Sequence, residues 1–180
     1  QARRCAASDW RLSSMLHDEY FCILPFEMMR DTEARCQEQA AGIKRAEPEA
    51  VETLTAGLLL SGFSMVVAGS SAPVSGGEHL LSHFWEMTRY AAGRPTLLHG
   101  LQVGISTLLA TTLHQRLRDW DPASFDWGRR RRTYPSWEQE VESIRSIYGA
   151  LTDAVLEEYA GKYQPWERKQ RQLERGFESW

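Results

Sequence analysis

The chain has 180 residues, of which 42% are hydrophobic and 25% charged, and this composition excludes disordered and fibrous proteins. Its formal net charge of −3 argues against nucleic acid as a partner. The one basic run, GRRRR at residues 128–132, is flanked by acidic and aromatic residues and predicts a solvated loop.

Apolar residues recur at helical spacing along nearly the whole chain, and no run alternates with a period of two, which predicts an all-α fold. We expect a helical bundle of six to nine helices, formed as a single domain over residues 1–180. In chain order, the predicted helices cover about residues 2–16, 25–45, 47–67, 77–90, 98–120, 136–148, 151–159 and 165–177.

Two segments interrupt this pattern. Residues 68–77, AGSSAPVSGG, are so rich in Gly, Ser and Pro that the backbone must leave the helix, and their serines are expected to cap the helix that follows. Residues 121–134, rich in Pro, Asp and Trp, predict a loop. The chain contains neither a GxGxxG nor a Walker sequence, so no residue is assigned to a nucleotide.

The cellular compartment is suggested by the cysteines and by the absence of targeting segments. Cys5, Cys22 and Cys36 have no CxxC spacing and cannot all pair, which favours a reducing compartment. The longest apolar stretch, residues 54–69, is expected to be too short and too rich in Gly and Ser to span a membrane. Since the chain does not open on a signal peptide, we expect a cytoplasmic protein with no membrane partner.

A pair of histidines, His79 and His83, lies four positions apart in the helix predicted over residues 77–90. Residues at this spacing share one helical face, about 5 to 6 Å apart at Cβ, so both imidazoles can reach one point. The spacing alone is more typical of a surface or packed pair than of ligands. His99 follows at the head of the next helix, and if a short loop joins two antiparallel helices, the end of this hairpin can hold His99 near His79.

A catalytic zinc ion uses three protein ligands and keeps one position open. The side chains that could supply a third ligand are Asp9, Asp18, Glu19 and Glu78. Because Glu78 is the neighbour of His79, it points about a quarter turn away, which suits a hydrogen bond to a ligand better than a bond to the metal. The two other histidines, His17 and His114, are expected to be surface or packing residues.

Residues 58–87, LLLSGFSMVVAGSSAPVSGGEHLLSHFWEM, and 97–109, LLHGLQVGISTLL, closely resemble the metal-binding domain of the sn-glycerol-1-phosphate dehydrogenases. That family belongs with the iron-containing alcohol dehydrogenases and dehydroquinate synthase. Its pattern is SG..M...GSS.P.SG.EH..SH..E followed by LHG..V..GT. The similarity extends upstream to SDWRLS and downstream to YPSWEQEVESIRSIYG, so it covers nearly the entire chain.

The resemblance implies an all-α C-terminal half that binds one divalent metal. His79 and His99 match two metal ligands of the family, and His83 matches a histidine close to the substrate. Zinc is the expected metal, with nickel or iron as alternatives. The loop residues expected to meet a small phosphorylated three-carbon substrate are Ser70, Ser71 and Ser75, for which helix capping is an equal alternative.

Two parts of the family pattern have no counterpart in the chain. One is the third ligand, an aspartate in a GD pair ahead of the DW motif; the other is the N-terminal half that binds NAD or NADP. We therefore expect a domain truncated at its N-terminus, which interconverts dihydroxyacetone phosphate and glycerol 1-phosphate only together with a nucleotide-binding half.

Other functions stay open at this stage. The chain could be a non-catalytic helical interaction module that retains the histidines, or part of another superfamily member, such as a polyol dehydrogenase or a dehydroquinate synthase-like lyase. The run GSSAPVSGGEHLLSH at residues 69–83 favours the glycerol-1-phosphate branch. Assembly into a homo-oligomer is also left open.

Overall fold

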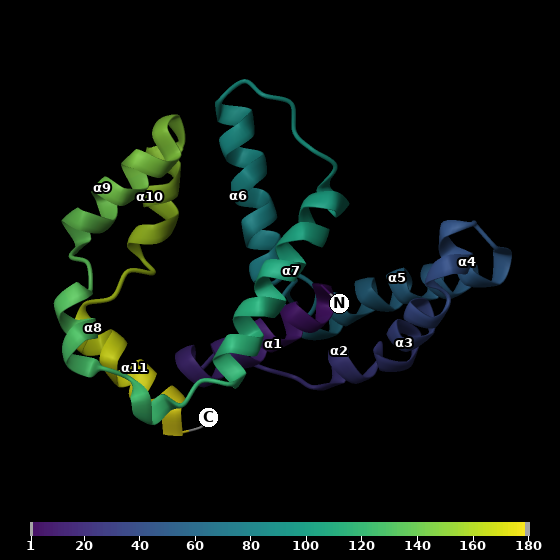
Figure 1. Ribbon diagram of the computed structural model, residues 1–180, viewed down its shortest axis with the longest axis horizontal. Coiled ribbons are helices and arrows are strands. Elements are labelled where there is room, and N and C mark those ends of the chain that lie inside the picture. The colour runs from purple at the N-terminus through teal and green to yellow at the C-terminus, as the bar shows by residue number, and fades with distance from the viewer. Residues whose placement is uncertain (1, 179–180) are drawn as a thin grey trace.

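The computed structural model describes residues 2–178, and these contain helices and no strand, which confirms the all-α prediction. In chain order the α-helices are α1 (Ala2–His17), α2 (Leu24–Glu27), α3 (Arg30–Glu38), α4 (Ala40–Lys44), α5 (Pro48–Ala68), α6 (Gly77–Ala91), α7 (His99–Arg118), α8 (Trp127–Thr133), α9 (Trp137–Tyr148), α10 (Thr152–Ala160) and α11 (Trp166–Glu178). Short 3-10 turns, η1 (Pro122–Ser124) and η2 (Gly149–Leu151), lie between them. Figure 1 shows α1, α6 and α7 between an arm made of α2 to α5 and an arm made of α8 to α11.

The helix predicted over residues 25–45 is instead three helices, α2, α3 and α4. The backbone bends at Met29, with φ −112°, and again at Gln39, with φ −92°. All three helices pack against α5. Tertiary packing therefore overrides local periodicity here, and it raises the number of helices in the described residues above the expected six to nine.

Helix α5 is delimited by residues suited to helix ends. Pro48 occupies the first turn, where a missing N–H costs nothing, and Gly69 adopts a left-handed φ of 66° after the last turn. The resulting helix has 21 residues, which by length and composition is enough to cross a membrane, so the expectation that this stretch is too short was wrong. Core helices of soluble proteins pass the same test but are mostly buried, whereas 17% of the most apolar window of α5 is buried.

The segment predicted as a loop over residues 121–134 contains helix α8. Asp126 begins this helix by accepting a hydrogen bond from the backbone N–H of Arg129, at 2.7 Å from nitrogen to Oδ1. The arginine run is therefore helical, and its side chains are exposed as expected for a solvated cluster. Edge-to-face contacts join Trp127 to Phe125 and Trp166, which anchors α8 to α11.

The junction of α1, α6 and α7 has an unusually polar interior. Its fully buried side chains include Glu78 and Ser82 from α6 and Gln102 and Ser106 from α7. Buried polar groups are costly unless they are hydrogen-bonded, and Ser106 Oγ meets this need by donating to the carbonyl of Glu78 at 2.7 Å. A polar core of this kind is typical of a functional site.

Apolar side chains are exposed along the outer faces of the long helices. On α5 they are Val51, Leu58, Leu59, Phe63, Met65, Val66 and Val67, and on α7 they are Leu101, Ile105, Leu108, Leu109, Leu113 and Leu117. Buried hydrophobic residues are few by comparison, with Trp10, Val103 and Ile144 among them. The long helices thus present faces of the kind that another protein surface covers.

Candidate metal site

The loop between α6 and α7 determines where His99 lies. Residues 92–98 run back along α6, so that α7 begins beside the middle of α6 (Figure 1). Two hydrogen bonds hold this loop: Arg89 Nε donates to the carbonyl of Pro95 at 2.9 Å, and Gln102 Nε2 donates to that of Leu97 at 3.1 Å. His99 therefore meets α6 along its length, whereas we expected the contact at the end of a hairpin.

The structure brings three histidines together. The ring centroids of His79 and His99 lie 5.5 Å apart, those of His83 and His99 also 5.5 Å, and those of His79 and His83 6.3 Å. Two of these rings come from successive turns of α6 and one from the first turn of α7. A cluster of three imidazoles offers nitrogen ligands suited to zinc, nickel or iron.

His79 is oriented by its sequence neighbour. Glu78 is fully buried, and its Oε1 lies 2.9 Å from Nδ1 of His79. An ionised carboxylate only accepts hydrogen bonds, so Nδ1 carries the proton and Nε2 keeps a free lone pair. In many metal sites a histidine ligand donates its other ring N–H to a carboxylate in this way, which fixes the tautomer and raises the basicity of the ligand.

Glu86 completes the cluster, although we did not single it out from the sequence. Its Oε1 lies 3.1 Å from Nδ1 of His99 and its Oε2 lies 3.2 Å from Nδ1 of His83. One ligand atom from each of these three residues falls within 4.8 Å of the others, which is compact enough for a metal ion, and His79 is not a member of this group. The hydrogen bonds with His99 and then His83 lower the pKa of the Glu86 carboxyl from its ordinary value. The signal for Glu86 was its place three residues after His83, on the same helical face.

The cluster fits a divalent metal by the chemistry of its donors. Each ring has its Nδ1 next to a carboxylate oxygen, and each therefore has Nε2 available for coordination. The partly exposed setting of the three imidazoles leaves room for water or substrate as further ligands. The residues present thus match the donor set of a catalytic site better than that of a closed structural one.

The carboxylates considered as third ligands lie elsewhere or have other partners. Asp9 accepts a hydrogen bond from the backbone N–H of Gly77 and pairs with His114. Asp18 pairs with Arg175 at 2.9 Å, and Glu19 is exposed. Glu78 contacts His79 as described, in the orienting role predicted for it.

The other predicted site residues have separate environments. Ser70 and Ser71 are exposed and Ser75 is half-buried, and within residues 2–178 no hydrogen bond joins them to the histidines. His83 is on the rim of the cluster with about half of its side chain exposed. Of the two histidines predicted to be surface or packing residues, His17 lies with its Nδ1 3.5 Å from Nε2 of Gln172, whereas His114 forms a specific pair with Asp9.

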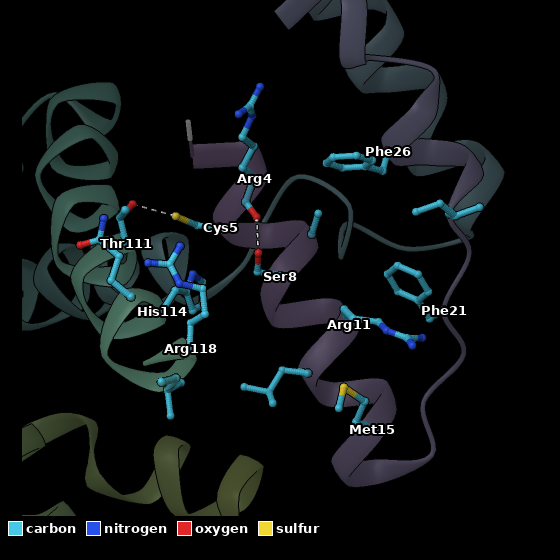
Figure 2. A pocket seen from close by; sticks show the side chains of 15 residues that line it. Arg4, Cys5, Ser8, Arg11, Met15, Phe21, Phe26, Thr111, His114 and Arg118 are labelled. Atoms are coloured by element: carbon cyan, nitrogen blue, oxygen red, sulfur yellow. Dashed lines mark hydrogen bonds between the residues drawn. The ribbon is translucent and has the colours of Figure 1, made fainter. Parts of the chain in front are cut away.

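A pocket of about 870 Å³ lies apart from the cluster, between α1 and the second half of α7 (Figure 2). Its polar rim includes Arg4, Arg11 and Arg118, and each arginine already has a partner: Glu33, the ring of Phe21 and Asp119, respectively. Figure 2 shows His114 on the wall of this pocket, near the contact between Cys5 and Thr111 of α7. The pocket holds none of the three clustered histidines.

Comparison with known proteins identifies relatives of the chain. Over 107 residues it is 40% identical to the glycerol-1-phosphate dehydrogenase [NAD(P)+] of Halalkalibacterium halodurans, a match that covers 59% of this chain and 27% of the relative. The enzyme of the same name from Geobacillus stearothermophilus is 28% identical over 176 residues, covering 89% of this chain and 44% of the relative. The enzyme of the same name from Hyperthermus butylicus is 36% identical over 113 residues, covering 63% of this chain and 31% of the relative. This chain is a homologue of the glycerol-1-phosphate dehydrogenases.

The matches fall in the C-terminal part of these dehydrogenases, and the chain spans less than half of their length. No known family model matches the chain. The all-helical fold agrees with a C-terminal helical half of the dehydrogenases, as the resemblance implied. The relatives are named for the use of NAD or NADP.

Proposed function

We propose that this chain is the metal- and substrate-binding domain of an NAD(P)-dependent sn-glycerol-1-phosphate dehydrogenase. The observation that carries the proposal is the convergence of His79, His83 and His99, with Nδ1 of His79 held by a buried carboxylate. The homology to dehydrogenases of this name supports the reaction. The chain forms a single helical domain over residues 1–180, works in the cytoplasm and acts only together with a nucleotide-binding half.

The roles follow from the positions of the rings. His79 and His99 would hold a divalent metal through their imidazole nitrogens, with zinc as the expected ion and nickel or iron as alternatives. A metal bound there supplies Lewis-acid polarisation of the oxygen on the reacting carbon. His83, one turn along α6 and more exposed, hydrogen-bonds the substrate and passes the hydroxyl proton toward solvent. Glu86 accepts from His83 and so keeps its ring directed into the cluster.

The substrate is a small phosphorylated three-carbon compound, dihydroxyacetone phosphate or glycerol 1-phosphate. Ser70, Ser71 and Ser75 contact its polar atoms from the loop that precedes α6. The exposed apolar faces of α5 and α7 leave surface for assembly with the nucleotide-binding half and for a homo-oligomer. A non-catalytic module would not need a buried glutamate that orients one histidine, so we favour the enzyme.

A chimera tests this function directly. This chain replaces the matching region of the Halalkalibacterium halodurans relative, and NADH or NADPH oxidation is followed with dihydroxyacetone phosphate. We expect metal-dependent turnover by the chimera, loss of turnover after His79→Ala or His99→Ala, and full turnover after His17→Ala, whose ring lies outside the cluster. The chain alone should neither bind the nucleotide nor turn over.

The same chimera separates the alternatives. Reduction of dihydroxyacetone in preference to dihydroxyacetone phosphate would favour a polyol dehydrogenase. Equal turnover by the His79→Ala and unsubstituted chimeras would refute the proposed role of the cluster. A folded chimera with no activity toward any of these substrates would favour the interaction module.

A further inference from the structure

The first turn of α6, which carries Glu78 and His79, is held by a side chain from another helix. Its N-cap residue, Gly76, has no side chain with which to accept the free N–H groups of the first turn. Asp9 of α1 supplies the acceptor: the backbone nitrogen of Gly77 lies 2.6 Å from Asp9 Oδ2. A carboxylate at this position is also favoured by the helix dipole. The serines expected to cap α6 are thus replaced by an aspartate distant in sequence.

Close packing fixes this contact. A Cβ added at Gly76 would lie 2.6 Å from Asp9 Oδ2 and 2.7 Å from the Cα of Ala6, closer than real Cβ contacts. The backbone of α1 therefore lies directly against the start of α6, and only glycine allows this approach. A shift of Asp9 would move the first turn of α6, because the backbones of α1 and α6 are in direct contact there.

The second oxygen of Asp9 is held by His114. Oδ1 lies 2.7 Å from Nε2 of His114, which projects from the second half of α7. The His114 side chain is 24% exposed and that of Asp9 30%, so both groups are screened only in part. With both oxygens engaged, Asp9 is not available as a metal ligand, and it links α1, α6 and α7 at one point.

A short chain of hydrogen bonds leads from this point to His79. The N–H of Gly76 donates to Glu78 Oε1 at 3.1 Å, and the same oxygen accepts from Nδ1 of His79 at 2.9 Å. Ser106 of α7 fixes the backbone of Glu78 by donating to its carbonyl. The position of the Gly76–Gly77 backbone therefore decides where the Glu78 carboxylate lies, and that carboxylate decides which nitrogen of His79 carries the proton.

We infer that Asp9 and His114 form a latch, the Asp9–His114 latch, that positions His79 for metal binding by fixing the first turn of α6. Both are positioning residues, since they act through Gly77 and Glu78 and do not touch the metal. The value of the latch for metal binding rests on the proposed function. The effect of the latch on the orientation of the His79 ring does not rest on the proposed function, because it can be measured without metal.

The test measures the tautomer of the His79 ring by long-range ¹H–¹⁵N NMR on the 180-residue chain without metal. The spectra are recorded at about pH 8, where an isolated imidazole is neutral. The wild-type chain should show His79 mainly protonated at Nδ1. Asp9→Ala removes both contacts and His114→Leu removes one, and both should shift His79 toward the Nε2-protonated form. His114→Gln, which keeps a donor at this position, should restore the wild-type spectrum at least in part.

Titration with Co²⁺ gives the second measurement. Loss of groups that orient a ligand costs about 10- to 100-fold in metal affinity, so we expect at least tenfold weaker binding by Asp9→Ala. The matched control is Asp119→Asn, which removes an exposed carboxylate paired with Arg118 near the end of α7 and should change neither measurement. Circular dichroism checks that each variant is folded. If the Asp9→Ala chain does not fold, the measurements on His114→Leu decide whether the latch positions His79.

The outcomes separate the two ideas. An unchanged His79 tautomer in folded Asp9→Ala and His114→Leu chains would overturn the latch, and so would an equal shift in Asp119→Asn. A wild-type chain that binds no Co²⁺ would refute the metal site, yet the tautomer measurement would still decide whether the latch orients His79.

Discussion

Glu86 is the residue whose ionisation reports on the histidine cluster. Its carboxylate has hydrogen bonds with His99 and His83, and these lower its pKa, with His99 the larger cause. We predict that ¹³C NMR titration of the wild-type chain gives a Glu86 pKa below that of an ordinary glutamate. His99→Ala should raise it toward the ordinary value by more than His83→Ala does. An equal, unshifted pKa in all three chains would contradict the observed contacts.

The same shift predicts a pH dependence of stability. Since the folded pKa of Glu86 is below its unfolded value, ionised Glu86 stabilises the fold at pH above the unfolded pKa, and this contribution is lost as pH falls through the folded pKa. Urea unfolding of the wild type and of Glu86→Gln should therefore differ most near neutral pH and converge in acid. A difference that grows as the pH falls would contradict the prediction.

At the residue scale, the sequence predicted contacts that depend on local spacing. His79 and His83 share a face because they are four apart, and the role of Glu78 followed from its place next to His79. The partners of Asp9 could not be predicted, because Gly77 lies 68 residues and His114 105 residues away along the chain. Only the packing of α1 on α6 and α7 brings these groups together.

At the scale of elements, the start of α6 is the most tightly constrained helix end near the site. We predict that Gly76→Ala lowers the free energy of unfolding by about 1 to 3 kcal/mol, since the added methyl would overlap the backbone of Ala6. Gly104→Ala is the matched control: its Cβ would meet nothing within 4 Å, and alanine in a helix should be neutral or stabilising by up to about 1 kcal/mol. Urea denaturation measures both.

One outcome of the urea measurements on Gly76→Ala and Gly104→Ala would contradict this prediction. If Gly76→Ala is as stable as Gly104→Ala, then α1 does not lie against α6 as described. A loss of Co²⁺ affinity in Gly76→Ala, even where the chain stays folded, would further support transmission from this helix end to His79.

Long, strongly periodic elements were the ones predicted well from the sequence. The helices that contain the histidines, α6 and α7, begin within about a residue of their expected starts, because the Gly- and Pro-rich loops before them are unambiguous. Two segments were predicted less well. The split of residues 25–45 depends on packing against α5, and α8 depends on the N-cap at Asp126, a local signal hidden in an otherwise loop-like sequence.

The whole molecule exposes far more surface than a compact protein of its size. Its accessible area is 12037 Å², whereas a monomer of this mass typically exposes about 8,900 Å². The difference, about 3,000 Å², is comparable to the area of an obligate interface. Many of the exposed large hydrophobic side chains lie on α5 and α7, so part of this extra surface is apolar.

We therefore predict that the isolated chain self-associates at micromolar concentration in sedimentation velocity. Leu108→Gln, on the exposed face of α7, should weaken self-association while changing the free energy of unfolding by less than about 0.5 kcal/mol. Glu157→Gln, an exposed polar position on α10, is the control and should leave association unchanged. A large loss of stability in Leu108→Gln would show that this face is buried within the chain.

The central claim, that the histidine cluster holds a metal, is tested most directly by equilibrium dialysis of the 180-residue chain against zinc, with the metal counted per chain. The account predicts one zinc ion per wild-type chain, binding weakened by about tenfold or more in His79→Ala and in His99→Ala, and unchanged binding in His17→Ala. No stoichiometric zinc in the folded wild-type chain, or equal affinity after removal of His79 or His99, would contradict it.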